Sequence, residues 1–134
     1  MSIQLSVAVR NARLAAILAT VGAGAVLKIY TGSVPASCAT GPTGTVLATV
    51  ALPTPFMGTP SGGVVAKSGT WDEPSADASG TAGYYRLLDS SAVCHEQGTV
   101  TATGGGGDMT VNNVVFAAGQ DFSVTGYTLT DANA

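Results

Sequence analysis

The chain has 134 residues, which is the size of one domain with one hydrophobic core. Only 10% of its residues are charged, and five Lys and Arg against eight Asp and Glu give a formal net charge of -3. This balance argues against nucleic acid as a partner, because binding to a phosphate backbone requires clustered positive charge. A surface with so few charges also provides little electrostatic repulsion between copies of the chain, so we expect an oligomer or a lattice contact.

Residues 2–21 predict an amphipathic helix. Their apolar side chains recur three and four positions apart, which places them on one stripe of a helix. The stripe consists of Leu14, Ile17, Leu18 and Val21. Gly22 follows, and glycine commonly ends a helix. We therefore expect a helix that offers one apolar face to the fold or to a partner.

The same region has a second interpretation as a secretory signal, because Arg10 and Arg13 precede an uncharged run over residues 14–27. That run is too short to predict a transmembrane span. We favour the helix, and divide the chain into an N-terminal helix or arm (residues 1–24) and a β domain (residues 25–134).

After the helix, short segments rich in β-branched and aromatic residues alternate with turn-forming residues, which is typical of strands in a sandwich. The predicted strands cover residues 25–31, 45–52, 64–71, 83–89, 93–103, 109–116 and 121–129. Residues 31–44 and 53–63 hold five of the six prolines and predict loops. We expect a mainly β fold, an antiparallel β-sandwich of jelly-roll type with one N-terminal helix; an immunoglobulin-like sandwich has a similar local pattern.

Two loops raise questions of function. Phe56 and Met57 lie among prolines and either contact a partner or close the open end of the core. Residues 72–83 contain three acids, but they lack the ligand spacing of an EF-hand calcium loop, so we expect a solvated loop. Neither loop predicts a metal site.

Four glycines, residues 104–107, lie between two segments with strand-like alternation. A phosphate-binding glycine loop requires a helix that starts directly after it, and residues 108–116 instead alternate as a strand does. We therefore expect a flexible hairpin connection here and no nucleotide site.

Cys94, His95 and Glu96 are adjacent in a predicted strand, where neighbouring side chains point to opposite faces. His95 is the only histidine, and catalysis by a Cys and His pair is not expected. Zinc would need Cys38 to fold onto the strand to join Cys94 and His95. A disulfide between Cys38 and Cys94 is possible under the same condition. We predict no catalytic, metal or cofactor site and no enzymatic activity.

Residues 25–32, 65–89, 98–113 and 124–133 resemble small virion proteins of tailed bacteriophages. The resemblance implies a structural β-sandwich protein, a capsid decoration or cement protein that binds the major capsid protein at the virion surface as a dimer or trimer. It implies assembly in the host cytoplasm, where both cysteines are reduced at first and a disulfide is possible only after lysis. We expect no contact with nucleic acid or membrane.

Candidate partner contacts for such a protein are the apolar side chains already named, Leu14, Ile17, Leu18, Phe56 and Met57. Deletion of residues 1–20 is then expected to abolish shell binding and leave the sandwich folded. A tail-fibre or receptor-binding adhesion module is the alternative, and a secreted adhesin or pilin-like subunit follows if the N-terminus is a signal peptide.

Overall fold

The computed structural model describes residues 3–131 and places one helix and nine strands in them. The elements are α1 (Val7–Val21), β1 (Val26–Thr31), β2 (Val46–Ala51), β3 (Val64–Ala66), β4 (Asp72–Glu73), β5 (Gly80–Leu88), β6 (Cys94–Ala102), β7 (Met109–Val111), β8 (Val115–Phe116) and β9 (Phe122–Thr130). The protein is thus mainly β with one N-terminal helix, as the sequence predicts.

The helix α1 begins later than predicted because Ser6 is its N-cap. The Ser6 hydroxyl accepts a hydrogen bond from the Val9 amide at 3.2 Å, which satisfies a donor that has no partner inside the helix. At the other end the Gly22 amide donates to the Leu18 carbonyl, and the helix stops where expected.

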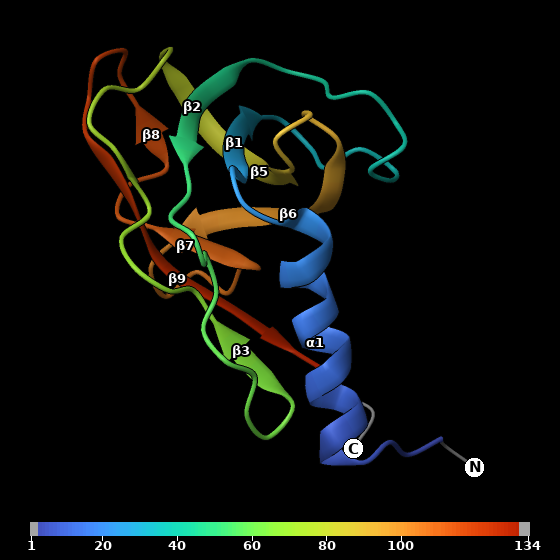
Figure 1. Cartoon of the computed structure of the whole chain (residues 1–134). Coiled ribbons are helices and arrows are strands. Elements are labelled where there is room, and N and C mark those ends of the chain that lie inside the picture. The colour runs from blue at the N-terminus through green and yellow to red at the C-terminus, as the bar shows by residue number, and fades with distance from the viewer. Residues whose placement is uncertain (1–2, 132–134) are drawn as a thin grey trace.

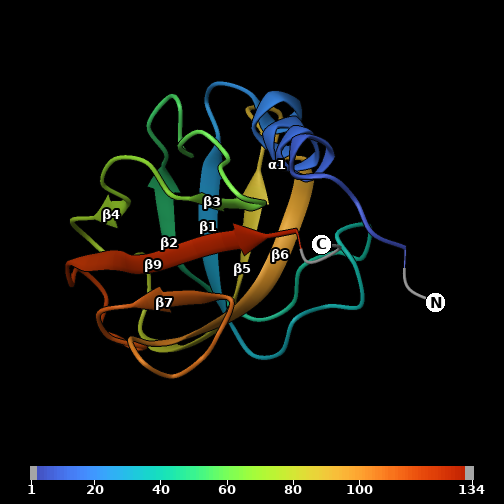
Figure 2. The same ribbon diagram turned by 90° about the horizontal axis from the view of Figure 1, so that it is seen from below.

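The strands form one curled sheet with the order β2-β1-β5-β6-β7-β9-β3, while β4 pairs with β9 and β8 with β5. Figure 2 shows β9 and β7 crossing over β1, β5 and β6, so the sheet curls into a half-barrel whose two arms enclose the core. Jelly-roll connectivity is not confirmed. The expected all-antiparallel pairing is wrong at one place, because β6 and β7 are parallel.

The glycine loop makes this parallel pairing possible, so the predicted hairpin is wrong. Parallel neighbours ordinarily need a crossover of about a dozen residues, yet residues 103–108 alone double back beside β6 before β7 begins opposite Val100. Gly104 has a backbone φ of 88°, a value that residues other than glycine rarely adopt. A Cβ on Gly107 would lie 2.8 Å from Thr101 Cγ2. The glycines therefore serve a tight turn against β6.

The core lies between the two arms of the sheet and is rich in aromatic side chains. Trp71 is 5.0 Å from Tyr127 between ring centroids, and Tyr127 meets Tyr85 edge-on at 6.1 Å. Leu14 and Val21 of α1 belong to the same buried cluster. Helix and sheet thus share one core, and α1 lies beside the sheet along its length in Figure 1.

Polar contacts fix α1 to the end of β9 and the turn before β3. Arg13 Nε lies 3.1 Å from Asp131 Oδ2, and Arg10 donates to the Asp131 carbonyl. The Gly63 amide donates to Asn11 Oδ1 at 2.9 Å. These bonds orient the helix that the apolar stripe holds against the sheet.

Two predicted strands are shorter than their patterns suggested. Residues 64–71 form a strand only to Ala66, and residues 109–116 divide into β7 and β8, which pair with different partners. The acidic segment predicted as a loop contains β4, whose Asp72 and Glu73 pair with β9.

Candidate functional site

The apolar stripe of α1 faces the core, which leaves only part of it accessible to a partner, at Ile17 and Leu18. Leu14 is buried, and Ile17 and Leu18 are half-buried against the core cluster. Deletion of residues 1–20 would therefore remove part of the core, and we expect it to destabilise the β domain as well as to remove the helix.

Phe56 and Met57 are 1% exposed, so their predicted role as surface contacts is wrong. Their loop is held against the sheet because the Ser68 amide donates to the Phe56 carbonyl and Met57 forms a bridge with Lys67. The Phe56 ring packs 6.3 Å from that of Trp71. Both residues belong to the core.

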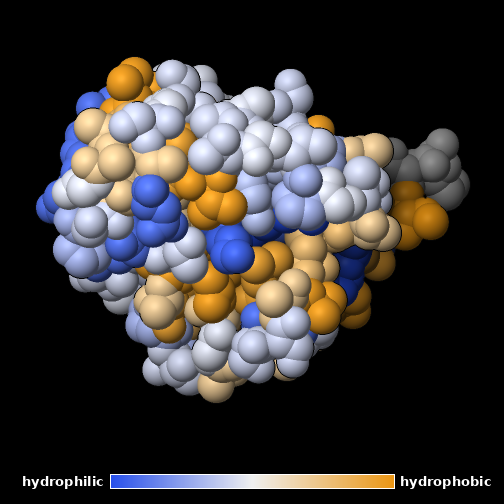
Figure 3. All heavy atoms as spheres, turned by 90° about the horizontal axis from the view of Figure 1, so that it is seen from above, coloured by the Kyte–Doolittle hydropathy of each residue, from blue (hydrophilic) through white to orange (hydrophobic). Residues whose placement is uncertain are grey.

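Exposed large apolar side chains are concentrated instead at the N-terminal end. Ile3 is 81% exposed, and Val7 and Val9 at the start of α1 are 47% and 45% exposed. We call these three residues the N-terminal apolar segment. Val64, Val93 and Val115 are also exposed, elsewhere on the molecule. Figure 3 shows hydrophobic residues in several groups on one face of the molecule, between weakly polar and strongly hydrophilic residues.

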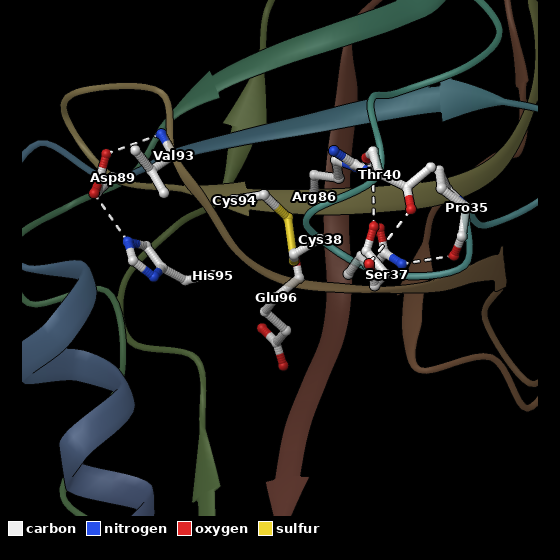
Figure 4. Close-up of a disulfide and its surroundings, with 11 residues drawn as sticks. Pro35, Ser37, Cys38, Thr40, Arg86, Asp89, Val93, Cys94, His95 and Glu96 are labelled. Atoms are coloured by element: carbon white, nitrogen blue, oxygen red, sulfur yellow. Dashed lines mark hydrogen bonds and ion pairs between the residues drawn. A yellow bond between two sulfur atoms is a disulfide. The ribbon is translucent and has the colours of Figure 1, made fainter.

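A disulfide joins Cys38 to Cys94, with a Cα–Cα distance of 5.3 Å (Figure 4). It ties residues 32–45, which we call the clasped loop, to the start of β6. The cysteines are 56 positions apart, and closing a loop of that length stabilises a fold by about 4 kcal/mol in the chain-entropy model. The clasped loop is therefore a fixed part of the surface.

Side chains on the outer face of the sheet hold the clasped loop as well. Arg86 Nη2 donates to the carbonyls of Ser37 and Thr40, and Gln97 Nε2 donates to the Pro35 carbonyl at 2.7 Å (Figure 4). The Tyr84 hydroxyl donates to the Thr43 carbonyl and accepts from the Thr43 amide.

Sequence analysis missed these loop-holding residues. The feature that could have indicated them is the alternation in β5, which places Tyr84 and Arg86 on one face of the sheet and Tyr85 and Leu87 on the other. All four are buried because the loop covers one face and the core the other. When both faces of a strand are buried and one face carries large polar side chains, another segment of the chain must cover that face and accept their hydrogen bonds.

Cys94, His95 and Glu96 point in different directions (Figure 4), because the register between β5 and β6 shifts here and leaves His95 as an extra residue between Cys94 and Glu96. Cys94 is in the disulfide, and His95 Nε2 lies 2.9 Å from Asp89 Oδ2. The hydrogen bond from His95 lowers the pKa of Asp89, and the backbone amide of Val93 acts in the same direction. The three side chains therefore do not form a catalytic set.

Glu96 lies in a tyrosine cluster between β6 and β9. The Tyr127 hydroxyl donates to Glu96 Oε2, and Tyr85 also hydrogen-bonds this carboxyl. Burial raises the pKa of Glu96, although both tyrosines act in the opposite direction. Burial also raises the pKa of Tyr127, so its hydroxyl keeps its proton and remains a donor. The hydrogen bond between Tyr127 and Glu96 joins β9 to the first half of β6, which β7 does not pair with.

Within residues 3–131, no three His, Cys, Asp or Glu side chains gather closely enough to hold a metal ion. The one helix described there is too short and insufficiently apolar to cross a membrane. Comparisons with protein-family models, curated proteins and solved structures find no match to this chain.

Proposed function

We propose that this chain is a structural protein of a tailed-bacteriophage virion, a decoration or cement protein without enzymatic activity. It binds the major capsid protein on the outer surface of the head as a dimer or trimer and bridges capsid subunits. The sequence resemblance supports this role. So does a fold in which the clasped loop and α1 are both fastened to the sheet, because a bridge must resist deformation to stabilise a shell.

The observation that carries the proposal is the N-terminal apolar segment. Ile3, Val7 and Val9 are exposed, while the remainder of α1 is fixed by its buried stripe and by the contacts of Arg10 and Arg13 with Asp131. Full burial against a neighbouring subunit would contribute about 1.5–3 kcal/mol for Ile3 and about half as much for each of Val7 and Val9, which are already half covered. The segment is thus a contact surface on a rigid support.

Replacing the side chains of the N-terminal apolar segment with polar ones tests whether this segment contacts the shell. The variant Ile3→Ser, Val7→Thr, Val9→Thr removes apolar surface and leaves the Ser6 cap and the buried stripe intact. We expect its affinity for shells of the major capsid protein to fall by about tenfold or more in co-sedimentation. The matched control is Val93→Thr, Val115→Thr, which changes equally exposed valines and should bind as the parent does.

Retention of parental affinity by the triple variant would refute a contact role for this segment. Failure of the parent itself to bind shells would refute the decoration role. Circular dichroism of each variant shows that the fold is retained, so that loss of binding reports the surface.

A tail-fibre or receptor-binding module is the second candidate. The clasped loop favours it, because small and polar side chains there are exposed on a backbone held by a disulfide. Loops of this kind suit recognition, since little entropy is lost when they bind. The number of copies in a particle separates this role from decoration.

A further inference from the structure

The clasped loop and the outer face of the sheet enclose a hollow of about 250 Å³. Its walls are the loop around Cys38 and Thr40, the sheet residues Lys28 and Arg86, and the disulfide. No carboxylate is among the residues that line it. The hollow is therefore a positively charged site in a protein that carries a net negative charge.

Two cations lie next to each other at the floor of this hollow. Lys28 of β1 and Arg86 of β5 are direct partners in the strand register. Side chains at such positions share one face with Cβ atoms about 5 Å apart, and like charges there repel. Neither residue belongs to an ion pair within residues 3–131. The repulsion is thus uncompensated inside the chain.

Arg86 also has an unused donor. The residue is 3% exposed, and its Nη2 is occupied by the two loop carbonyls, but its buried Nε has no hydrogen-bond partner. Leaving a buried donor unsatisfied costs about 1–3 kcal/mol. This donor is covered on all sides, so an anion in the hollow would act on the charge of the cation pair and not on Nε.

We propose that this hollow binds a small oxyanion, a carboxylate or phosphate group, between Lys28 and Arg86. Arg86 supplies a positive charge that the loop carbonyls hold in place, and Lys28 supplies a second positive charge on a flexible side chain. The site is independent of the proposed role in the virion. Its ligand is either a free anion or an anionic group on a partner.

Titration of the isotope-labelled chain with sodium phosphate and, separately, sodium acetate tests the proposal by nuclear magnetic resonance at constant ionic strength. We expect the amide signals of residues 38–41 to shift saturably, with a dissociation constant in the range of about 1 mM. The variant Lys28→Met, which keeps the aliphatic stem, should weaken binding at least about fivefold. The matched control, Lys67→Met, should not.

Saturation by phosphate alone would indicate a phosphate-bearing ligand, and saturation by acetate would indicate a carboxylate, such as an acidic side chain of a protein partner. Shifts that stay linear in anion concentration would overturn the proposal. So would equal affinity of the parent and the Lys28→Met variant.

Discussion

Glu96 is a carboxyl group held between two tyrosines, and its ionisation should be visible in stability. Because burial raises its pKa, the folded state favours the protonated form more than the unfolded state does. The stability it contributes is therefore complete below the ordinary glutamate pKa of 4.5 and is lost as the pH rises through the folded value.

Replacement of Glu96 by Gln should accordingly raise the free energy of unfolding at about pH 7 and leave it almost unchanged near pH 4. Glutamine keeps an acceptor for Tyr127 and does not ionise. Urea denaturation at the two pH values measures the difference. Tyr127→Phe should have the opposite effect and steepen the loss of stability with pH, because it removes a bond that favours the carboxylate. A gain from Glu96→Gln that is the same at both pH values would contradict this account.

Arg86 shows why some single residues could not be assigned from sequence. A charged side chain is ordinarily exposed, and only the covering loop makes this one buried. Phe56 and Met57 are the converse case, since a proline-rich loop predicts exposure and tertiary packing buries it. The disulfide was foreseen only as a possibility, because spacing along the chain does not determine whether two cysteines meet.

At the scale of elements, the longer strands were predictable and their pairing was not. Alternating or β-branched runs gave β1, β2, β5, β6 and β9 to within a few residues. The same alternation in β6 and β7 is compatible with parallel or antiparallel neighbours. The parallel register of β6 and β7 and the close contact of Gly107 with Thr101 distinguish the doubled-back loop from a hairpin, and neither can be read from the alternation.

The doubled-back loop predicts which glycines are required. Gly107→Ala should destabilise the protein by about 1–3 kcal/mol, because the new methyl group would press on Thr101. Gly41→Ala is the matched control, since a Cβ there meets nothing within 4 Å. It should change stability by no more than about 0.5 kcal/mol. Urea denaturation compares the two, and equal effects would favour a loop with freedom to move away from β6.

At the scale of the whole molecule, one curled sheet, one helix and one disulfide produce a small rigid body. Three of the six large apolar side chains that are exposed within residues 3–131 lie at the N-terminal end, on or just before a helix fixed to the core by Leu14 and Val21. Rigidity and an apolar edge suit a protein that bridges neighbours in a symmetric shell. The decoration role therefore predicts many copies in each particle.

The measurement that tests this role most directly is the copy number of the chain relative to the major capsid protein in purified particles, by quantitative mass spectrometry. The decoration role predicts a ratio of about one half to one, since every local symmetry position of the shell offers a site. A few copies to a few tens in each particle would contradict it and favour a tail or vertex adhesin, and absence from the particle would contradict any role in the virion.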